Sequence, residues 1–403
     1  MITFEEARQI VVREVQRTAP VLAHETVSLS ESLGRVLAQE VRADRPYPPF
    51  NRSIRDGYAV RAADVVAGAQ LPCVGEIKAG DEPVAPLASG TCKQIMTGAA
   101  VPAGADAVVM IEQTRSDGTS IEFLRAAAPG QHFVPRGREA AEGEVLLGSG
   151  TRIGYAEIAV AAQAGAVRLQ VFRKPRVAIL STGDEVVPAE AKPGEFQIRN
   201  SNAYSLAAQV SLAGGEPVLL GNAKDDEADL RAKIVEGLKH DLLILSGGVS
   251  AGKYDLVETV LNEMGTKFFF DAVAIRPGKP VVFGVCSGKP VFGLPGNPIS
   301  TMVTFELFVV PAVHFLSGAA AKPVGFLQAR LGEALHEKPG LAHFLPARIE
   351  WPENAPVVKP LRWQGSGDLA TVSKCNCFLF VPMDRSEVAE GEYVSVLPRR
   401  DLL

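Results

Sequence analysis

The sequence lacks the features that mark several common classes of protein. Its five cysteines are odd in number and scattered over 403 residues, which excludes the disulfide framework of a small secreted domain and indicates a reducing compartment. Lys and Arg total 41 against 46 Asp and Glu, and the net charge of −5 argues against a dedicated nucleic-acid or anionic-membrane binder. No signal peptide and no apolar run of about 18 residues is evident. We therefore expect a soluble, cytoplasmic protein without nucleic-acid or membrane partners.

What the sequence does contain is enough apolar material for several hydrophobic cores. Hydrophobic residues make up 47% and charged residues 22% of the chain, the balance of a globular protein. At roughly 150 residues per domain, the length predicts about two to three domains.

The first third of the chain predicts a helical and β part that is interrupted by a small β domain. Thr3 and Glu6 have capping-box spacing before a helix, and a second short helix is expected at residues 31–39. The proline-rich residues 45–50 cannot continue a helix, and short β-runs punctuated by Gly and Pro follow. Helical periodicity returns at residues 151–168, so the first domain is expected to be discontinuous.

Residues 176–315 alternate apolar runs with helical stretches. The runs at 177–180, 218–220 and 242–245 have no polar alternation, which is typical of strands buried on both faces of a parallel sheet. The runs at 281–285 and 291–294 predict an antiparallel addition to this sheet. Short β-runs return after residue 322. We therefore predict a multidomain α/β plus β fold of four parts: a discontinuous helical and β domain (1–46 plus 144–172), an inserted β domain (47–143), an α/β domain (173–321) and a C-terminal β domain (322–403).

Candidate binding residues follow the predicted strands, because ligands of open α/β sheets bind beyond the carboxyl ends of the strands. The segment 246–250 reads SGGVS, whose paired glycines and hydroxyls suit a phosphate, although an ordinary glycine-rich turn is the alternative. Arg276 and Lys279 flank a rigid turn suited to an oxyanion, or to plain solvation. The segment 295–298 reads PGNP, in which Asn297 either lies on the same rim or only caps the next helix.

Carboxylates follow the same strands. Asp184 and Glu185 suit a Mg²⁺ ion that is also bound by phosphate oxygens. Asp225 and Asp226 stand before a predicted helix, so Asp225 is either a site residue or a helix cap. Asp255 follows the glycine-rich segment and either favours the helix dipole or faces a ligand. The sequence leaves these alternatives open.

Five strings together resemble one known family. They are FNRSIRDGYAV (50–60), IMTGA (95–99), STGDE (181–185), SGGVS (246–250) followed by Asp255, and PGNP (295–298). In this order they are similar to the molybdopterin molybdenumtransferases, that is, the MoeA proteins and the gephyrin E domain, over essentially the whole chain.

The resemblance implies a fold, an assembly and a reaction. It implies an elongated molecule with an α/β domain like that of the molybdopterin adenylyltransferases (MogA-like, three layers), an inserted β domain and a C-terminal β domain. It implies a homodimer whose cleft lies between the α/β domain of one subunit and the inserted domain of the other. The implied substrates are adenylylated molybdopterin and molybdate, with Mg²⁺ as cofactor and AMP as a product. A molybdopterin adenylyltransferase and apo-molybdoenzymes are the further expected partners.

The resemblance also assigns roles to residues by matching position. Those implied as catalytic are Asp56, Thr97, Glu185, Asp225 and Asp255. The implied Mg²⁺ ligands are Glu185 and Asp184. The implied substrate-binding residues are Ser181, Thr182, Gly183, Asp184, Ser246, Gly247, Gly248, Val249, Ser250, Arg276, Lys279, Pro295, Gly296, Asn297 and Pro298.

The chain departs from the family pattern at a few positions. Asn51, Arg52 and Arg55 make the turn before Asp56 unusually basic, Glu139 stands where an aspartate is familiar, and Arg276 stands where lysine is common. These differences leave the choice between molybdate and tungstate open. Two other functions remain alternatives: a non-catalytic pterin carrier or scaffold, and a molybdopterin adenylyltransferase.

Overall fold

The structure is a computed structural model that describes residues 1–403 except 19–22, 83–84, 249–255, 321, 353–354 and 403. The chain divides into two compact units. Unit 1 comprises Met1–Ala38, Gly150–Ile153 and Gln170–Leu403, and unit 2 comprises Gln39–Ser149 and Gly154–Leu169. The four predicted domain boundaries stay a prediction.

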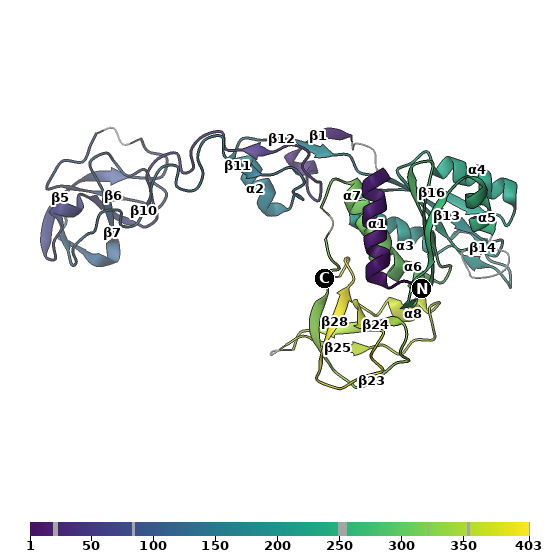
Figure 1. The fold of residues 1–403 in the computed structure, drawn as a ribbon. Helices are drawn as coiled ribbons and strands as arrows, with labels where there is room; N and C mark the ends of the chain where they lie inside the picture. The colour runs from purple at the N-terminus through teal and green to yellow at the C-terminus, as the bar shows by residue number, and fades with distance from the viewer. Residues whose placement is uncertain (19–22, 83–84, 249–255, 321, 353–354, 403) are drawn as a thin grey trace. The chain divides into compact units, whose positions relative to one another are not determined.

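Unit 1 contains an α/β sheet of six strands, which confirms the expected fold class. Its strand order is β16-β13-β17-β21-β20-β18. Figure 1 labels the neighbouring strands β16 and β13. The first four strands are parallel neighbours, whereas β20 runs antiparallel to β21 and β18 runs antiparallel to β20. The strands are β13 (Arg176–Thr182), β16 (Glu216–Ala223), β17 (Leu242–Ser246), β18 (Lys267–Ala272), β20 (Pro280–Cys286) and β21 (Lys289–Leu294).

Helices cover both faces of this sheet, because successive strand residues point to opposite sides. Val177 and Ile179 of β13 join one buried cluster, while Ala178 and Leu180 join the other. The first cluster is completed by α1 (Phe4–Thr18), α3 (Asn202–Ala213), α6 (Pro298–Thr304), the π-helical turn η4 (Phe305–Val309) and α7 (Val310–Leu316). The second is completed by α4 (Glu227–Gly237) and α5 (Leu256–Glu263), which lie together on their side of the sheet (Figure 1). The three-layer prediction is therefore confirmed.

The C-terminal residues of unit 1 form a second sheet. Its strands β24, β25, β22, β28 and β26 close into a ring through the pairing of β24 with β26, and β19 adds to β24. Ring closure leaves no free strand edge among these five strands. The bounds in this region are β19 (Ile275–Arg276), β22 (Leu327–Leu331), β23 (Leu335–His336), β24 (Ala342–Glu350), β25 (Val357–Pro360), α8 (Leu369–Val372), β26 (Cys377–Val381), β27 (Glu387–Val388) and β28 (Tyr393–Pro398). The remaining short elements are β1 (His24–Ser28), η1 (Leu29–Glu31), β12 (Arg168–Phe172), β14 (Val186–Val187) and β15 (Ile198–Arg199).

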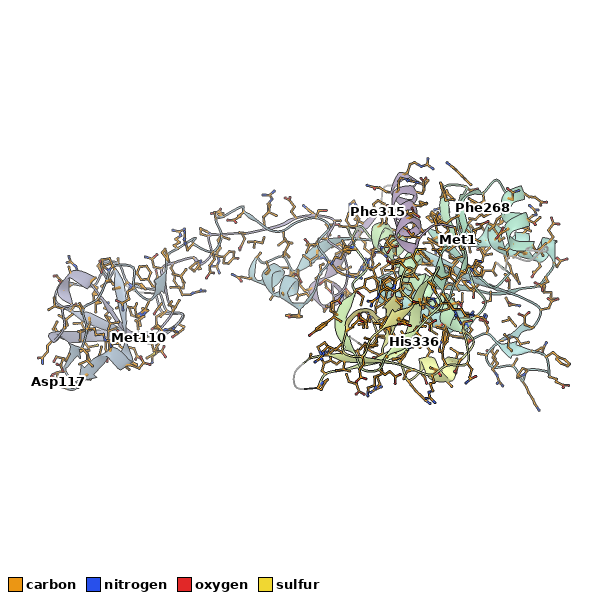
Figure 2. The ribbon with its side chains drawn as sticks, turned by 60° about the horizontal axis from the view of Figure 1, so that its bottom comes forward. Met1, Met110, Asp117, Phe268, Phe315 and His336 are labelled. Atoms are coloured by element: carbon orange, nitrogen blue, oxygen red, sulfur yellow. The ribbon has the colours of Figure 1, made fainter. Side chains whose placement is uncertain are left out.

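Unit 2 is built mainly from β-strands, as predicted for the inserted segment. Its largest sheet has the order β7-β4-β6-β5-β9-β8 and packs around Val60, Cys92 and Phe123. Asp117 lies in the turn between β8 and β9 (Figure 2), where it accepts hydrogen bonds from the amides of Thr119 and Ser120. The bounds are β2 (Val41–Arg42), β3 (Arg52–Ser53), β4 (Gly57–Val60), η2 (Ala62–Asp64), β5 (Ala69–Ile77), β6 (Cys92–Ile95), β7 (Ala107–Met110), η3 (Ile111–Gln113), β8 (Thr114–Ser116), β9 (Ser120–Phe123), β10 (Phe133–Val134), β11 (Val145–Leu147) and α2 (Tyr155–Gln163).

The local predictions at the N-terminus had opposite outcomes. The capping box is confirmed, since the Glu6 amide donates to Thr3 Oγ1 (3.2 Å) and the Thr3 amide donates to Glu6 Oε2 (2.8 Å). The predicted helix at residues 31–39 is wrong. Gly34 has a φ of +76°, a left-handed conformation that ends a helix, and Val36 and Leu37 form β-bridges with Arg152 and Val171.

One helical stretch, Pro298–Leu316, has the length and composition of a membrane-spanning helix. Most of it is buried inside unit 1, where Ile299, Phe305 and Val313 pack in the core. This burial is typical of the core helix of a soluble protein.

Candidate active site

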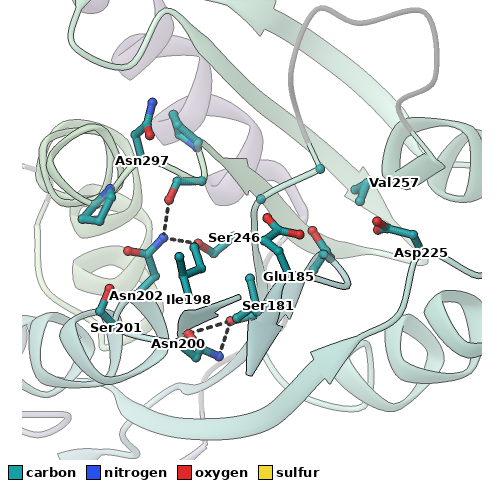
Figure 3. Close-up of a pocket in the computed structure, with 18 of the residues that line it drawn as sticks. Ser181, Glu185, Ile198, Asn200, Ser201, Asn202, Asp225, Ser246, Val257 and Asn297 are labelled. Carbon is teal, nitrogen blue, oxygen red and sulfur yellow. Dashed lines mark hydrogen bonds between the residues drawn. The ribbon is translucent and has the colours of Figure 1, made fainter. Parts of the chain in front are cut away.

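The carboxyl ends of the parallel strands surround a cavity of about 1150 Å³ (Figure 3). Ser181 and Ser246 are register neighbours at the ends of β13 and β17, and Leu294 ends β21 beside Ser246. The cavity therefore lies where open α/β sheets bind ligands. The predicted site residues that line it are Ser181, Thr182, Gly183, Glu185, Asp225, Ser246, Gly247, Gly248, Pro295, Gly296, Asn297 and Pro298.

The glycine pair after β17 passes very close to the end of β13. Gly247 and Gly248 have φ values of +95° and +64°, which L-residues with side chains rarely adopt. A Cβ atom at Gly247 would lie 2.9 Å from the Thr182 carbonyl oxygen, and one at Gly248 would lie 2.8 Å from Val257 Cγ2. Only glycine fits at either position. The Gly247 amide donates to the Leu294 carbonyl (3.1 Å), so the Gly248 amide is the candidate of the pair for binding an anion. Val249 and Ser250 lie outside the described residues.

The acidic side of the cavity comes from two loops. Glu185 follows β13 and folds back over Gly183, where an added Cβ would collide with its carboxylate. Asp226, not Asp225, is the N-cap of α4, because its side chain accepts from the Asp229 amide (2.9 Å). Asp225 is thereby left to line the cavity (Figure 3), and its amide donates to Asp184 Oδ1 (3.2 Å). Asp184 itself is not among the lining residues, and Asp255 lies outside the described part of the chain.

The turn after β21 forms a wall shared with a second cavity. Pro295 and Asn297 line both the large cavity and a smaller one of about 330 Å³. Asn297 occupies the N-cap position of α6 without a side-chain capping bond, and Pro298 is the first helical residue. Helix capping by the Asn297 side chain is therefore excluded in this structure.

The two predicted cations line the smaller cavity. Arg276 and Lys279 are among its lining residues, and Arg276 NH1 lies 4.0 Å from Glu337 Oε2. Glu337 Oε2 lies 3.1 Å from Nδ1 of His343, whose side chain is almost fully buried. Both cations are exposed and border an open cavity next to the larger one, so an oxyanion site at this turn stays a prediction beside the alternative of a solvated turn.

Asp56 and Thr97 lie together in unit 2. Asp56 Oδ1 accepts hydrogen bonds from the Thr97 amide (2.6 Å) and from Thr97 Oγ1 (2.8 Å). The amide bond first, and the hydroxyl bond second, lower the pKa of Asp56 below its ordinary value. This carboxylate is therefore held charged and in a fixed orientation on an exposed loop.

Comparison with known proteins adds independent evidence. Three family profiles match successive parts of the chain: the MoeA N-terminal region (domain I and II) at residues 2–165, a probable molybdopterin binding domain at 178–314 and the MoeA C-terminal region (domain IV) at 328–398. The molybdopterin molybdenumtransferase of Nostoc sp. is 36% identical over 391 residues, covering 93% of this chain and 88% of the relative. The chain belongs to the molybdopterin molybdenumtransferase family.

Other relatives agree with this membership. The molybdopterin molybdenumtransferase of Haemophilus influenzae is 32% identical over 409 residues and is covered completely by this chain. The crystal structure of the molybdopterin biosynthesis MoeA protein from Pyrococcus horikoshii OT3 superposes with a TM-score of 0.81 at 28% identity, covering 99% of this chain and 100% of that one. The family resemblance read from the sequence is therefore confirmed, together with the expected fold and the expectation of a transferase of molybdenum cofactor biosynthesis.

Within this family member, the sequence reasoning missed three asparagines under the site. Asn200 Nδ2 donates to Ser181 Oγ (2.9 Å), Asn202 Nδ2 donates to Ser246 Oγ (3.0 Å), and Asn222 Nδ2 donates to the Gly183 carbonyl (2.8 Å). Each amide thus holds a residue that a motif had already identified. A signal was present, since Asn200 and Asn202 stand at the start of a helical stretch, but helix capping is an equally good explanation for asparagines there.

Proposed function

We propose that this chain inserts molybdenum from molybdate into adenylylated molybdopterin and releases AMP, in a Mg²⁺-dependent reaction. Membership in the molybdenumtransferase family supports a pterin substrate. The finer parts of the proposal are the adenylylated form of the pterin, the release of AMP and the requirement for Mg²⁺.

The observation that carries the proposal is the pair of adjoining cavities. The cavity of about 1150 Å³ is large enough for a nucleotide-sized ligand, and the neighbouring one of about 330 Å³ suits a small oxyanion. Pro280, Pro295 and Asn297 line both, so a ligand in each would meet at this wall. A reaction between a large phosphorylated substrate and a small oxyanion fits two such compartments.

The acidic residues of the large cavity fit a hard cation. Within the described residues, no group of three or more His, Cys, Asp and Glu is clustered tightly enough to hold a metal by itself. Mg²⁺ usually takes only one or two carboxylates and completes its shell with water and substrate phosphates. Glu185 and Asp225 both line the cavity and would hold the ion, and Asp184 supports the Asp225 backbone. When bound, Mg²⁺ neutralises charge on a phosphate group.

We assign the remaining roles by chemistry. The Gly248 amide binds the phosphate end of the pterin nucleotide, as amides of glycine-rich anion loops do, while the Gly247 amide holds the loop on the Leu294 carbonyl. Arg276 and Lys279 attract the oxyanion into the smaller cavity. Pro295 and Pro298 keep the wall between the cavities rigid.

We further propose that the protein acts as a cytoplasmic homodimer. In this arrangement Asp56 and Thr97 of one subunit complete the site of the other. The fixed orientation of the Asp56 carboxylate and its lowered pKa support a role as a permanently charged group near the reacting atoms.

The proposal is tested by incubating the purified protein with adenylylated molybdopterin, molybdate and Mg²⁺ and measuring AMP by chromatography. We expect AMP release that requires all three, and loss of activity after chelation that Mg²⁺ restores. Absence of AMP above background with retained pterin binding would instead identify a carrier. Formation of adenylylated pterin from ATP and molybdopterin would identify an adenylyltransferase.

A further inference from the structure

The segment at the start of α3 reaches the ends of three neighbouring parallel strands. Asn200 holds Ser181 at the end of β13, and Asn202 holds Ser246 at the end of β17. Asn202 Nδ2 also donates to the Gly296 carbonyl (2.8 Å), in the turn that follows β21. These bonds are drawn as dashed lines in Figure 3. One asparagine side chain therefore joins two of the loops that enclose the large cavity.

The orientation of the Asn202 amide follows from its partners. The Gly296 carbonyl can only accept a hydrogen bond, so the atom facing it must be the nitrogen. Asn202 Oδ1 is then turned away, and it is buried without a hydrogen-bond partner among the described residues. A buried polar atom without a partner is unfavourable, so this arrangement lowers the stability of the fold.

The bond to Gly296 acts on the wall between the two cavities. Pro295 and Asn297, on either side of Gly296, line both cavities. Thr301 Oγ1 donates to the Pro295 carbonyl (2.5 Å) and accepts a longer bond from Asn202 Nδ2 (3.4 Å). The carbonyls of Pro295 and Gly296 are thus tied to one small group of side chains.

The Asn202 side chain does not cap the start of α3. The Ala203 amide, in the first turn of α3, is bonded by Asn200 Oδ1 (3.0 Å). Asn202 makes its side-chain hydrogen bonds to Ser246, Gly296 and Thr301, all outside α3. Its removal should therefore leave α3 intact while releasing the wall.

We propose that Asn202 is a positioning residue that fixes the distance between the pterin nucleotide and the oxyanion by holding the 295–298 turn against the end of β17. This inference rests on the proposed function. Because Asn202 holds the wall and not a ligand, its loss should slow the transfer more than it weakens binding. A misplacement of about 1 Å in an active site lowers rates by roughly 100-fold.

Gln209 provides a matched control on the same helix. It is an amide whose Nε2 donates to the Met302 carbonyl of α6 (3.2 Å) and to Glu306 Oε1 (2.9 Å). Its Oε1 is also buried without a partner among the described residues. Gln209→Ala therefore removes a similar set of bonds between α3 and the α6 region, but away from the wall.

The experiment compares Asn202→Ala, Asn202→Asp and Gln209→Ala with the wild type. For Asn202→Ala we expect kcat for AMP release to fall at least about 10-fold, while the Kd for adenylylated molybdopterin changes less than about threefold. Asn202→Asp keeps the shape of the side chain but turns an oxygen toward the Gly296 carbonyl. Its kcat should therefore fall further than that of Asn202→Ala. Gln209→Ala should keep kcat within about twofold of wild type, even if its melting temperature falls as much as that of Asn202→Ala.

Two results would overturn the inference: Asn202→Ala with a wild-type kcat, or Gln209→Ala with an equal loss of kcat. Amide hydrogen exchange at Gly247 and Thr301 provides a readout that does not depend on activity, because these amides donate to the Leu294 carbonyl (3.1 Å) and the Asn297 carbonyl (3.0 Å) at either end of the turn. Exchange at both should be faster in both Asn202 variants. If the wild-type protein releases no AMP, the proposed function fails. Unchanged exchange at Gly247 and Thr301 would then separately reject the role of Asn202.

Discussion

The two acidic regions of this protein are held in opposite ways. In unit 2, hydrogen bonds act directly on the catalytic candidate, since two donors of Thr97 bind Asp56 Oδ1. In unit 1, the bonds lie beneath the site: Asn222 holds the carbonyl of Gly183, and the amide of Asp225 is held by Asp184. The loops that carry Glu185 and Asp225 are therefore braced, while no hydrogen bond from the described residues constrains their carboxylates.

This difference indicates two electrostatic roles for the carboxylates. A carboxylate that is fixed by its own hydrogen bonds keeps one charge in one place, which suits stabilisation of a transition state. Carboxylates on braced loops can still adjust to a ligand and would suit a hard cation. Substitutions at each kind of carboxylate separate the two roles.

The largest effects are expected from Asp56→Ala and Glu185→Ala. Each should lower AMP release by about 100-fold or more, the scale for groups that act on developing charge. Neither should unfold the protein, because Asp56 lies on an exposed loop and Glu185 lines a cavity. The measurement is steady-state AMP release, with melting temperature as the control for folding.

A mixed dimer of these two variants sharpens the comparison. If each site combines Glu185 of one subunit with Asp56 of the other, a heterodimer of Asp56→Ala and Glu185→Ala chains has one intact site. It should recover about half of the wild-type rate per dimer. A heterodimer that stays as inactive as its parents would show that both residues act within one subunit.

Neighbouring aspartates in unit 1 should show the next effect. Asp226→Ala removes the cap of α4 and should lower the free energy of unfolding by about 0.5–2 kcal/mol, with AMP release nearly unchanged. Asp225→Ala should do the reverse, with AMP release about 10-fold lower and stability within about 0.5 kcal/mol of wild type. Urea unfolding and turnover, measured on both variants, would refute the assignment if the two effects were exchanged.

Asp225 and Asp226 also show what cannot be predicted from the sequence alone. The sequence correctly predicted the buried parallel strands, because unbroken apolar runs such as 177–180 have few alternatives. It left Asp225 and Asp226 undecided, because both residues have good capping chemistry and only the backbone path selects one. It failed at residues 31–39, where apolar spacing resembled a helix but Gly34 and long-range bridges to Arg152 and Val171 determine the conformation.

The three asparagines under the site were missed for a similar reason. The motifs identified residues that end strands, such as Ser246, since the position after an apolar run is visible in the sequence. Asn202 lies 44 residues before Ser246 and 94 residues before Gly296, and its contacts exist only after the sheet has formed. No local pattern predicts them.

Thr97→Val tests the fixed carboxylate of unit 2 with a smaller change. Valine keeps the shape and the backbone amide of residue 97 but removes the hydroxyl bond to Asp56. Since that bond favours the charged form, its loss should raise the pKa of Asp56 toward its ordinary value. The acid limb of the pH–rate profile should therefore move to higher pH, while the rate at neutral pH changes little. The control is Thr91→Val, which removes a hydroxyl that donates to the Ala88 carbonyl. An acid limb that moves to lower pH in Thr97→Val would contradict the role of Thr97.

The smallest effect is expected at the basic turn of unit 2. Arg52 NH2 lies 2.7 Å from Glu139 Oε1, so these two unusual residues form an ion pair, and both side chains are more than a third exposed. Exposed pairs contribute about 0.2–1 kcal/mol and are screened by salt. A double-mutant cycle of Arg52→Ala and Glu139→Ala should thus give a coupling within that range that disappears near 1 M NaCl. The turn itself should persist, because the Arg136 amide bonds Asn51 Oδ1 (3.0 Å) and the Val101 amide bonds the Asn51 carbonyl (2.8 Å). A coupling well above 1 kcal/mol at high salt would mean that the pair, and not these backbone bonds, holds the loop that carries Asp56.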